Sequence, residues 1–326
     1  MNTLSLTISN PAGGDVWPET LSTPSLDLVF SRGNRKTRIN TSLIETWMEQ
    51  LFTHQTNEIA ISTLLARMNP ELSTYSHYLC CELVDYSAGM NDVFMHRLKE
   101  PVNATLDSKR YASLLLESFD GALIHHVSEW PSLFVLGLNE DPEISSTPAA
   151  QAHRRPLSTV LPAGSRSQHW IAKMNEIQML FHQSNENLEN DKMPTKPNGV
   201  WLWGEGHLQE LQDSHLLISA QSPELIAISR AANATLTSID QILNAESTPI
   251  DALIDIHITE DKSSLDKANA LVTRSIGLLK SGHYGRLKVQ LIQNSISLET
   301  SCTKYMLHKF WLKTGKTIDW IRNACN

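Results

Sequence analysis

The stretch ALIDIHITEDKSSLDKANALVTRSIGLLKSGHYGRLKVQLIQ, residues 252–293, has the pattern of a strand, a helix and a second strand. Its two ends are rich in aliphatic and β-branched residues, whereas residues 264–280 repeat apolar side chains at helical spacing. Two strands joined through a helix are typical of parallel neighbours in one sheet. This stretch therefore predicts an α/β fold.

The segments around this stretch extend the same alternation. Residues 199–203 (GVWLW) and 215–219 (HLLIS) are typical of strands, and residues 223–233 (PELIAISRAAN) are typical of a helix. Together they predict a mainly parallel sheet with flanking helices over residues 156–326. The last two strand-like runs, 286–293 and 302–310, are expected to form an antiparallel pair at the edge.

The first half of the chain has an α+β texture. A strand over 4–8 precedes an arm over 11–40 that is rich in Pro, Gly, Ser, Thr and Asn and is expected to be irregular. Two helices are expected to follow, over 42–52 and 57–68, and a third over 106–119. Strand-like runs occupy 78–84, 92–98, 122–130 and 132–138, and Pro131 between the last two favours a hairpin. We expect a boundary near residue 155, between regions 1–155 and 156–326.

Composition excludes several classes of protein. The 27 Lys and Arg residues against 35 Asp and Glu give a formal charge of −8, which argues against a general nucleic-acid-binding surface. The four cysteines have neither zinc-ribbon spacing nor the look of a disulfide framework. No apolar run reaches the ~18 residues of a membrane span. These features predict a cytoplasmic protein that binds neither nucleic acid nor membrane.

The helix expected from residue 170 carries two stripes. Trp170, Met174, Ile177 and Phe181 share an apolar stripe, and a narrow polar stripe beside it holds Asn175, Gln178 and His182. Two carboxamides and an imidazole are neutral donors and acceptors that suit a polar ligand. Alternatively, these side chains tie the helix to an adjoining loop.

The segment PNGVWLWGEGHL, residues 197–208, is a second candidate. We expect Gly204-Glu205-Gly206 to follow a strand at the carboxyl end of the sheet, where α/β proteins bind ligands and glycines let the backbone approach an anion. The spacing lacks the further residues of a dinucleotide or P-loop motif, so neither NAD nor ATP is predicted. The alternative is that Trp201 and Trp203 are core residues under a helix.

Two further groups concern metal and thiol chemistry. Asp255 and His257 share one face of an expected strand, either as metal ligands or as a hydrogen-bonded pair at the strand end. Cys80 and Cys81 lie in an apolar strand, which favours burial over reactivity. No Ser–His–Asp arrangement can be assembled from the sequence.

Residues 161–208 resemble the signature of a proteobacterial family, the RpfE-type regulatory proteins. The matching positions are Leu161-Pro162-x-Gly164, Trp170, Asn175-Glu176-Ile177-Gln178-Met179-Leu180-x-His182, and Asn198-x-x-Trp201-x-Trp203-Gly204-x-Gly206. Weaker agreement extends over most of the chain. The segment Gln183-Ser184-Asn185-Glu186 stands where the family has His-Pro-Val-Asn, and Val84-Asp85-Tyr86-Ser87 stands where it has Asp-Pro-Val-His.

Members of that family are sometimes labelled cofactor-independent phosphoglycerate mutases, and the segment 198–206 is similar to one in the archaeal enzymes of the alkaline-phosphatase superfamily. That likeness implies two divalent metal ions, a Ser or Thr nucleophile, and Asp and His ligands. His257 and Asp261 match the late ligands, but Lys262-Ser263 replaces the Gly-His, and no early Asp-Gly is found. Since part of a ligand set cannot hold two ions, the resemblance implies that catalysis is lost.

The sequence thus favours a non-catalytic, mutase-derived protein that binds a small polar ligand or a protein partner, with a regulatory role and no cofactor. The expected ligand-binding residues are Asn175, Glu176, Gln178, His182, Asn198, Trp201, Trp203, Gly204, Glu205, Gly206 and His207. The alternative is a metal-dependent phosphomutase or phosphatase with a rearranged site, whose candidate ligands are Asp255, His257 and Asp261. A scaffold without a pocket is a third possibility.

Overall fold

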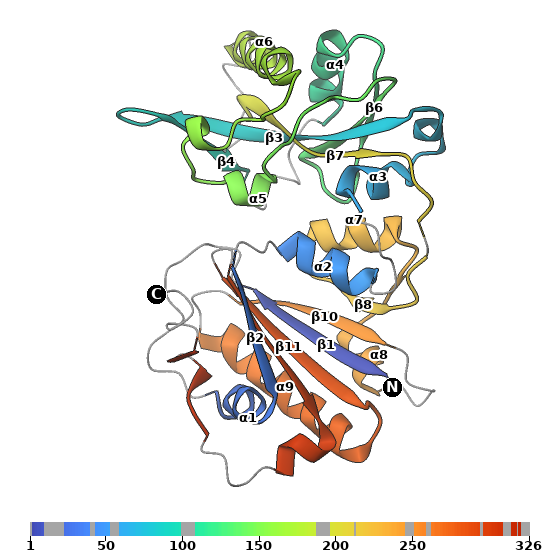
Figure 1. Cartoon of the computed structure of the whole chain (residues 1–326), viewed down its shortest axis with the longest axis vertical. Helices are drawn as coiled ribbons and strands as arrows, with labels where there is room; N and C mark the ends of the chain where they lie inside the picture. Colours follow the sequence, from blue (N-terminus) through green and yellow to red (C-terminus); the bar gives the residue numbers. More distant parts are fainter. Residues whose placement is uncertain are drawn as a thin grey trace. The chain divides into compact units, whose positions relative to one another are not determined.

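In a computed structural model, the chain divides into two compact units (Figure 1). Unit 1 combines Met1–Thr53 with Asp213–Asn326, and unit 2 is His54–Gln212. The structure describes residues 2–9, 23–39, 43–52, 59–98, 108–186, 196–211, 213–244, 251–258, 262–293, 296–308, 314–317 and 319–320. None of the helices in those ranges has the length and apolar character needed to cross a membrane.

Unit 1 is built on a seven-stranded sheet with the order β2-β12-β11-β1-β10-β8-β9. Its strands are β1 (Thr3–Ser9), β2 (Asn34–Ile39), β8 (Leu217–Ser219), β9 (Thr235–Leu236), β10 (Ala252–His257), β11 (Arg286–Gln293) and β12 (Ile296–Thr303). The N-terminal strand β1 pairs in parallel with both β10 and β11. β12 pairs antiparallel with β11, and β2 pairs antiparallel with β12.

The two faces of this sheet differ in polarity because side chains alternate along each strand. Leu4, Leu6 and Ile8 of β1 belong to the apolar core cluster, which also contains residues of α1 (Pro24–Arg32), α8 (Ile239–Asn244) and α9 (Lys262–Ser281). On the other face, Gln50 of α2 (Leu43–Leu51) donates to Gln290 Oε1 at 3.0 Å, inside the protein. Figure 1 shows α2 and α7 (Pro223–Ala231) on the side of this sheet opposite α1 and α9.

Unit 2 holds a second, antiparallel sheet with the order β4-β3-β6-β5, in which β7 also pairs with β3. Its strands are β3 (His77–Ala88), β4 (Val93–Arg97), β5 (Leu123–His126), β6 (Leu133–Leu138) and β7 (Gly199–His207). The unit also contains α3 (Ile61–Ala66), η1 (Pro70–Thr74), α4 (Ser108–Ser118), α5 (Ala149–Ala152), η3 (Leu157–Thr159) and α6 (Ser167–Glu186). The expected hairpin around Pro131 is confirmed, because β5 pairs antiparallel with β6.

Several expectations need correction. The expected boundary near residue 155 falls inside unit 2, and β1 lies between two strands of the C-terminal half. Residues 24–39 are not irregular: they form α1 and β2, while most of the earlier part of the expected arm lies outside the described residues. The antiparallel partner of β11 is Ile296–Thr303 and not 302–310, which begins at the end of β12 and continues as η4 (Lys304–His308).

The strand over 199–203 is also placed differently from the expectation. It is part of β7, which pairs antiparallel with β3 in unit 2 and does not belong to the parallel sheet. Gly204, Glu205 and Gly206 lie within this strand, so they do not form a loop at the carboxyl end of a parallel sheet. The mixed α/β character and the mainly parallel sheet of the expected fold are confirmed in unit 1.

Candidate functional site

The two stripes of α6 have the periodicity expected. Trp170, Met174, Ile177 and Phe181 are all buried. The indole of Trp170 donates to Pro142 O at 2.8 Å, and the ring of Phe181 packs edge-on to Tyr111 with centroids 4.9 Å apart. This apolar stripe therefore packs α6 against the rest of unit 2.

The polar stripe of α6 lies on its exposed flank. Asn175, Gln178 and His182 are exposed, and exposed Glu176 pairs with Lys173 Nζ at 2.8 Å. The stripe is not brought to the segment Gly204–Gly206: the Cβ positions of Gly204 and Gly206 point toward α3, which Figure 1 shows on the face of this sheet opposite α6. The stripe and the glycines therefore do not line one site.

The glycines of β7 are explained by close packing. A Cβ added at Gly206 would lie 2.3 Å from Thr63 Oγ1 and 2.4 Å from Ala60 Cβ. Gly204 has φ +67°, in the left-handed region that favours glycine. The Glu205 carboxylate accepts hydrogen bonds from the backbone N–H (3.0 Å) and the hydroxyl of Ser146. The residues around α3 and Ser146 thus occupy the space beside Gly204–Gly206 in which a ligand was expected.

The remaining candidates in β7 hold the sheet together. Asn198 exchanges two hydrogen bonds with the backbone of Tyr86, at 2.6 and 2.8 Å, which extends the β3–β7 pairing. Trp201 is fully buried and donates to Thr147 O at 2.8 Å. Trp203 is buried with its ring centroid 6.1 Å from that of Trp130. The alternative of two core tryptophans is therefore confirmed.

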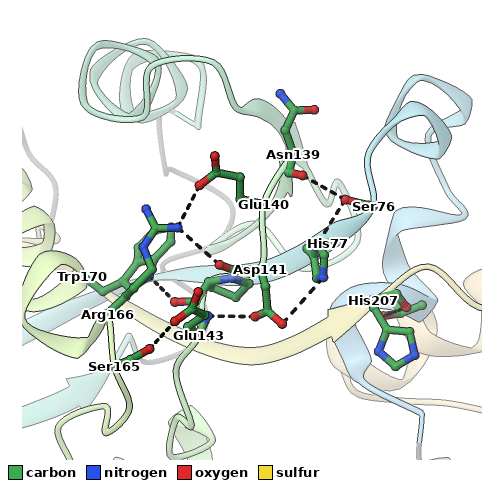
Figure 2. Close-up of polar contacts among 12 residues, drawn as sticks. Ser76, His77, Asn139, Glu140, Asp141, Glu143, Ser165, Arg166, Trp170 and His207 are labelled. Atoms are coloured by element: carbon green, nitrogen blue, oxygen red, sulfur yellow. Dashed lines mark hydrogen bonds and ion pairs between the residues drawn. The ribbon is translucent and has the colours of Figure 1, made fainter.

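His207 lies opposite His77 at the end of the β3–β7 pairing. Nε2 of His77 lies 3.8 Å from Asp141 Oδ2, and its Nδ1 is 3.0 Å from Ser76 Oγ (Figure 2). Asp141 also accepts a hydrogen bond from Glu143 N at 2.8 Å. These contacts of Asp141 anchor the loop after β6. The His207 ring lies apart from them (Figure 2).

A different group of polar side chains gathers in unit 1, where β1 and β10 end. Asp255 Oδ2 lies 3.1 Å from His257 Nε2, so the two side chains meet at the strand end as expected, although the contact does not have the geometry of the expected hydrogen bond. Thr7 is the register partner of Asp255, and Ser9 is the register partner of His257. Since registered partners on neighbouring strands project to the same face, the four side chains share one face. Asp261 lies outside the described residues.

Three of these four residues are almost completely inaccessible to solvent: Thr7 and Asp255 are 0 % exposed and Ser9 is 3 % exposed. Among the residues described, neither hydroxyl has a hydrogen-bond partner, and neither carboxylate oxygen of Asp255 accepts a hydrogen bond. Buried polar atoms are normally satisfied, and an unsatisfied one costs about 1–3 kcal/mol, more for a charged group. We call Thr7, Ser9, Asp255 and His257 the β1/β10 polar cluster.

The sequence carried a signal for this cluster. β1 reads TLSLTIS, in which Thr3, Ser5, Thr7 and Ser9 alternate with Leu4, Leu6 and Ile8. The alternation indicates a strand with one hydroxyl-bearing face. Periodicity does not show which strand pairs with β1, because its partner β10 lies more than 240 residues further along the chain.

The candidate metal ligands Asp255 and His257 both belong to the β1/β10 polar cluster. An Asp carboxylate and a His imidazole are both ligands of divalent cations. In the described part of the chain, no three His, Cys, Asp or Glu side chains are grouped so that they could hold a metal ion. Asp255 and His257 therefore supply two coordinating groups, with a hydroxyl-bearing residue next to each.

The thiols of Cys80 and Cys81 are expected to be unreactive in the folded protein. Both residues are buried, and burial raises the pKa of each thiol, with a further contribution from the charge of Glu82. The reactive thiolate is therefore scarce at neutral pH.

A Cys325→Ser variant tests this, because the three cysteines that remain, Cys80, Cys81 and Cys302, are all buried. The folded variant should show almost no reaction with a thiol reagent at pH 8. Unfolding in guanidinium should expose Cys80, Cys81 and the buried Cys302. Rapid modification of Cys80 or Cys81 before unfolding would contradict their burial.

Comparisons with known proteins bear on the fold. No protein-family model matches the chain, and no curated protein matches it. Among solved structures, it is similar to the PH0037 protein from Pyrococcus horikoshii, with a TM-score of 0.50 and 9 % identity over 92 % of this chain and 87 % of that one. It is also similar to a cofactor-independent phosphoglycerate mutase from Thermoplasma acidophilum DSM 1728, with a TM-score of 0.48 and 14 % identity over 98 % and 94 % of the two chains. At such identities, a likeness concerns the fold alone.

Proposed function

We propose that the protein binds a small polar ligand at the β1/β10 polar cluster and that it acts as a binding protein, with a regulatory role, and not as a catalyst. The observation that carries this proposal is the Asp255 carboxylate, fully buried and without a hydrogen-bond donor among the described residues except for its contact with His257. Such a group is satisfied by a ligand that brings N–H or O–H donors or a positive charge.

The position of the cluster supports the same proposal. Ser9 and His257 are the last residues of two parallel strands, and Ser219 ends β8, the next strand in the sheet. Ligands of open α/β sheets bind outside the carboxyl ends of the strands. His257, whose side chain is 23 % exposed, connects the buried Asp255 with the surface. The hydroxyls of Thr7 and Ser9 add groups that can both donate and accept.

Asp255→Asn tests this proposal. Thermal unfolding of the purified protein would be measured against a panel of small amines, amino alcohols and polyols, and native mass spectrometry would show any ligand retained during purification. We expect the variant to bind the best compound at least about ten-fold more weakly, because a charge-assisted hydrogen bond contributes about 1.5–3 kcal/mol.

Asp266→Asn is the matched control, since it removes the same charge from an exposed position on α9. This control should respond like the wild type. Equal affinity of the Asp255→Asn variant and the wild type for the compound would contradict the proposed site.

A metal-dependent phosphomutase or phosphatase is the second candidate. It is favoured by the 3.1 Å approach of Asp255 Oδ2 to His257 Nε2, two atoms of the kinds that coordinate divalent cations. When bound, such an ion would supply Lewis-acid activation of a phosphate oxygen. Elemental analysis of the protein and a phosphomonoester panel with Mn²⁺, Mg²⁺ or Zn²⁺ separate the two functions. Tight metal binding with turnover that His257→Ala abolishes would replace our proposal by this one.

A further inference from the structure

Arg32, the last residue of α1, is a buried cation to which no described residue supplies a counter-charge. The residue is 9 % exposed, and its Nε and Nη1 atoms are both buried without a hydrogen-bond partner among the residues described. It also forms no ion pair with that part of the chain. Other arginines do have carboxylate partners: Arg38 pairs with Glu49, Arg97 with Glu82, Arg166 with Glu140 and Arg274 with Asp240.

An unpaired guanidinium in this position is costly. Arginine stays protonated in proteins, so it cannot relieve the cost of burial by losing its proton, as a lysine can. The penalty for an uncompensated buried ion is several kcal/mol. The negative end of the α1 dipole lies beside Arg32, but a cation at a helix C-terminus gains about 0.3–1 kcal/mol, and at most about 2. The helix dipole therefore leaves most of the penalty uncompensated.

The surroundings of Arg32 hold the end of α1 in place. Gly33 follows it in an extended conformation, and a Cβ there would lie 2.3 Å from Thr300 Oγ1 of β12. Thr300 Oγ1 donates to Val29 O at 3.3 Å, so α1 is fixed directly to the sheet. Val29 and Phe30 of the same helix belong to the apolar core cluster. Arg32 is thus held on a well-packed helix, and none of the described contacts of that helix neutralises its charge.

We propose that Arg32 binds a small oxyanion, the carboxylate or phosphate group of a small molecule. The planar guanidinium matches the oxygen atoms of both groups through parallel N–H···O hydrogen bonds. The ligand is small because little of Arg32 reaches the surface. This site lies on the α1 side of the sheet, whereas the β1/β10 polar cluster lies on the opposite face, so the two sites are independent.

The test compares thermal unfolding in sodium chloride, sodium phosphate and sodium acetate at equal ionic strength. The wild type should be stabilised by phosphate or by acetate relative to chloride, and Arg32→Met, which keeps the apolar stem, should lose this specific increase. Phosphate also stabilises proteins through exclusion from their surfaces, and the variant measures that general effect. A larger response to phosphate assigns a phosphoryl ligand, and a larger response to acetate assigns a carboxylate.

Arg35→Met is the matched control, because Arg35 is exposed and stacks on Trp320 at 4.6 Å. It should keep the wild-type response. If Arg32→Met does not fold, calorimetric titration of the wild type and Arg32→Lys with phosphate and acetate replaces it, and the lysine variant should bind at least about ten-fold more weakly. Equal responses of the wild type and the Arg32 variant, or no response of the wild type to either anion, would overturn the proposal.

Discussion

Gly206→Val is expected to lower the free energy of unfolding of unit 2 by about 3 kcal/mol, the upper part of the usual range for overpacking. The first added atom already falls 2.3 Å from Thr63 Oγ1 and 2.4 Å from Ala60 Cβ, so α3 must move away from β7. For a unit of this size, the change corresponds to a fall in Tm of about 6–12 °C. Circular dichroism during heating would measure it.

Gly277→Ala is the control for this prediction. Gly277 lies inside α9, and a Cβ there meets no atom within 4 Å. Alanine should therefore stabilise that helix by about 0.5–1 kcal/mol. If Gly206→Val unfolded at the wild-type temperature and lost only the affinity for a ligand, the glycine would have the binding role that its spacing first indicated.

Trp201→Ala is expected to cost about 4 kcal/mol, within the range measured for large buried aromatic residues. Trp201 is fully buried, and its indole N–H donates to Thr147 O at 2.8 Å. The substitution leaves a cavity and also an unpaired carbonyl at Thr147. Urea unfolding followed by circular dichroism would give the change in free energy.

Trp201→Phe separates the two contributions. Phenylalanine retains much of the packing and removes the donor, so its cost should be well below that of alanine. An alanine variant as stable as the wild type would show that Trp201 is not a core residue and would restore its candidacy as a ligand contact.

Periodicity predicted the parts of the fold that depend on neighbouring residues. The strand–helix–strand of residues 252–293 is present as β10, α9 and β11, and the buried stripe of α6 is present as expected. Partners distant in the chain were not predictable in this way. β7 begins with a continuous buried run, Gly199–Trp203, which fits an inner strand of either kind of sheet, and its pairing with β3 makes it antiparallel.

The candidate site shows the same division. The shared face of Asp255 and His257 follows from their spacing on one strand, and the structure confirms their contact. The glycines of β7 were misassigned because a glycine that admits α3 and a glycine that admits an anion look alike in a sequence. The sequence does not distinguish Arg32 from other arginines, because an arginine at the end of a helix is ordinarily solvated and the burial of this one is visible only in the structure.

The interruption of unit 1 by unit 2 sets an order for folding on the ribosome. β1 ends at Ser9, but its neighbour β10 begins only at Ala252. At a synthesis rate of about 5–20 residues per second, the first strand waits of the order of 10–50 s for a partner. Unit 2, residues 54–212, is complete in the nascent chain before that time, so it can fold before the sheet of unit 1 is assembled.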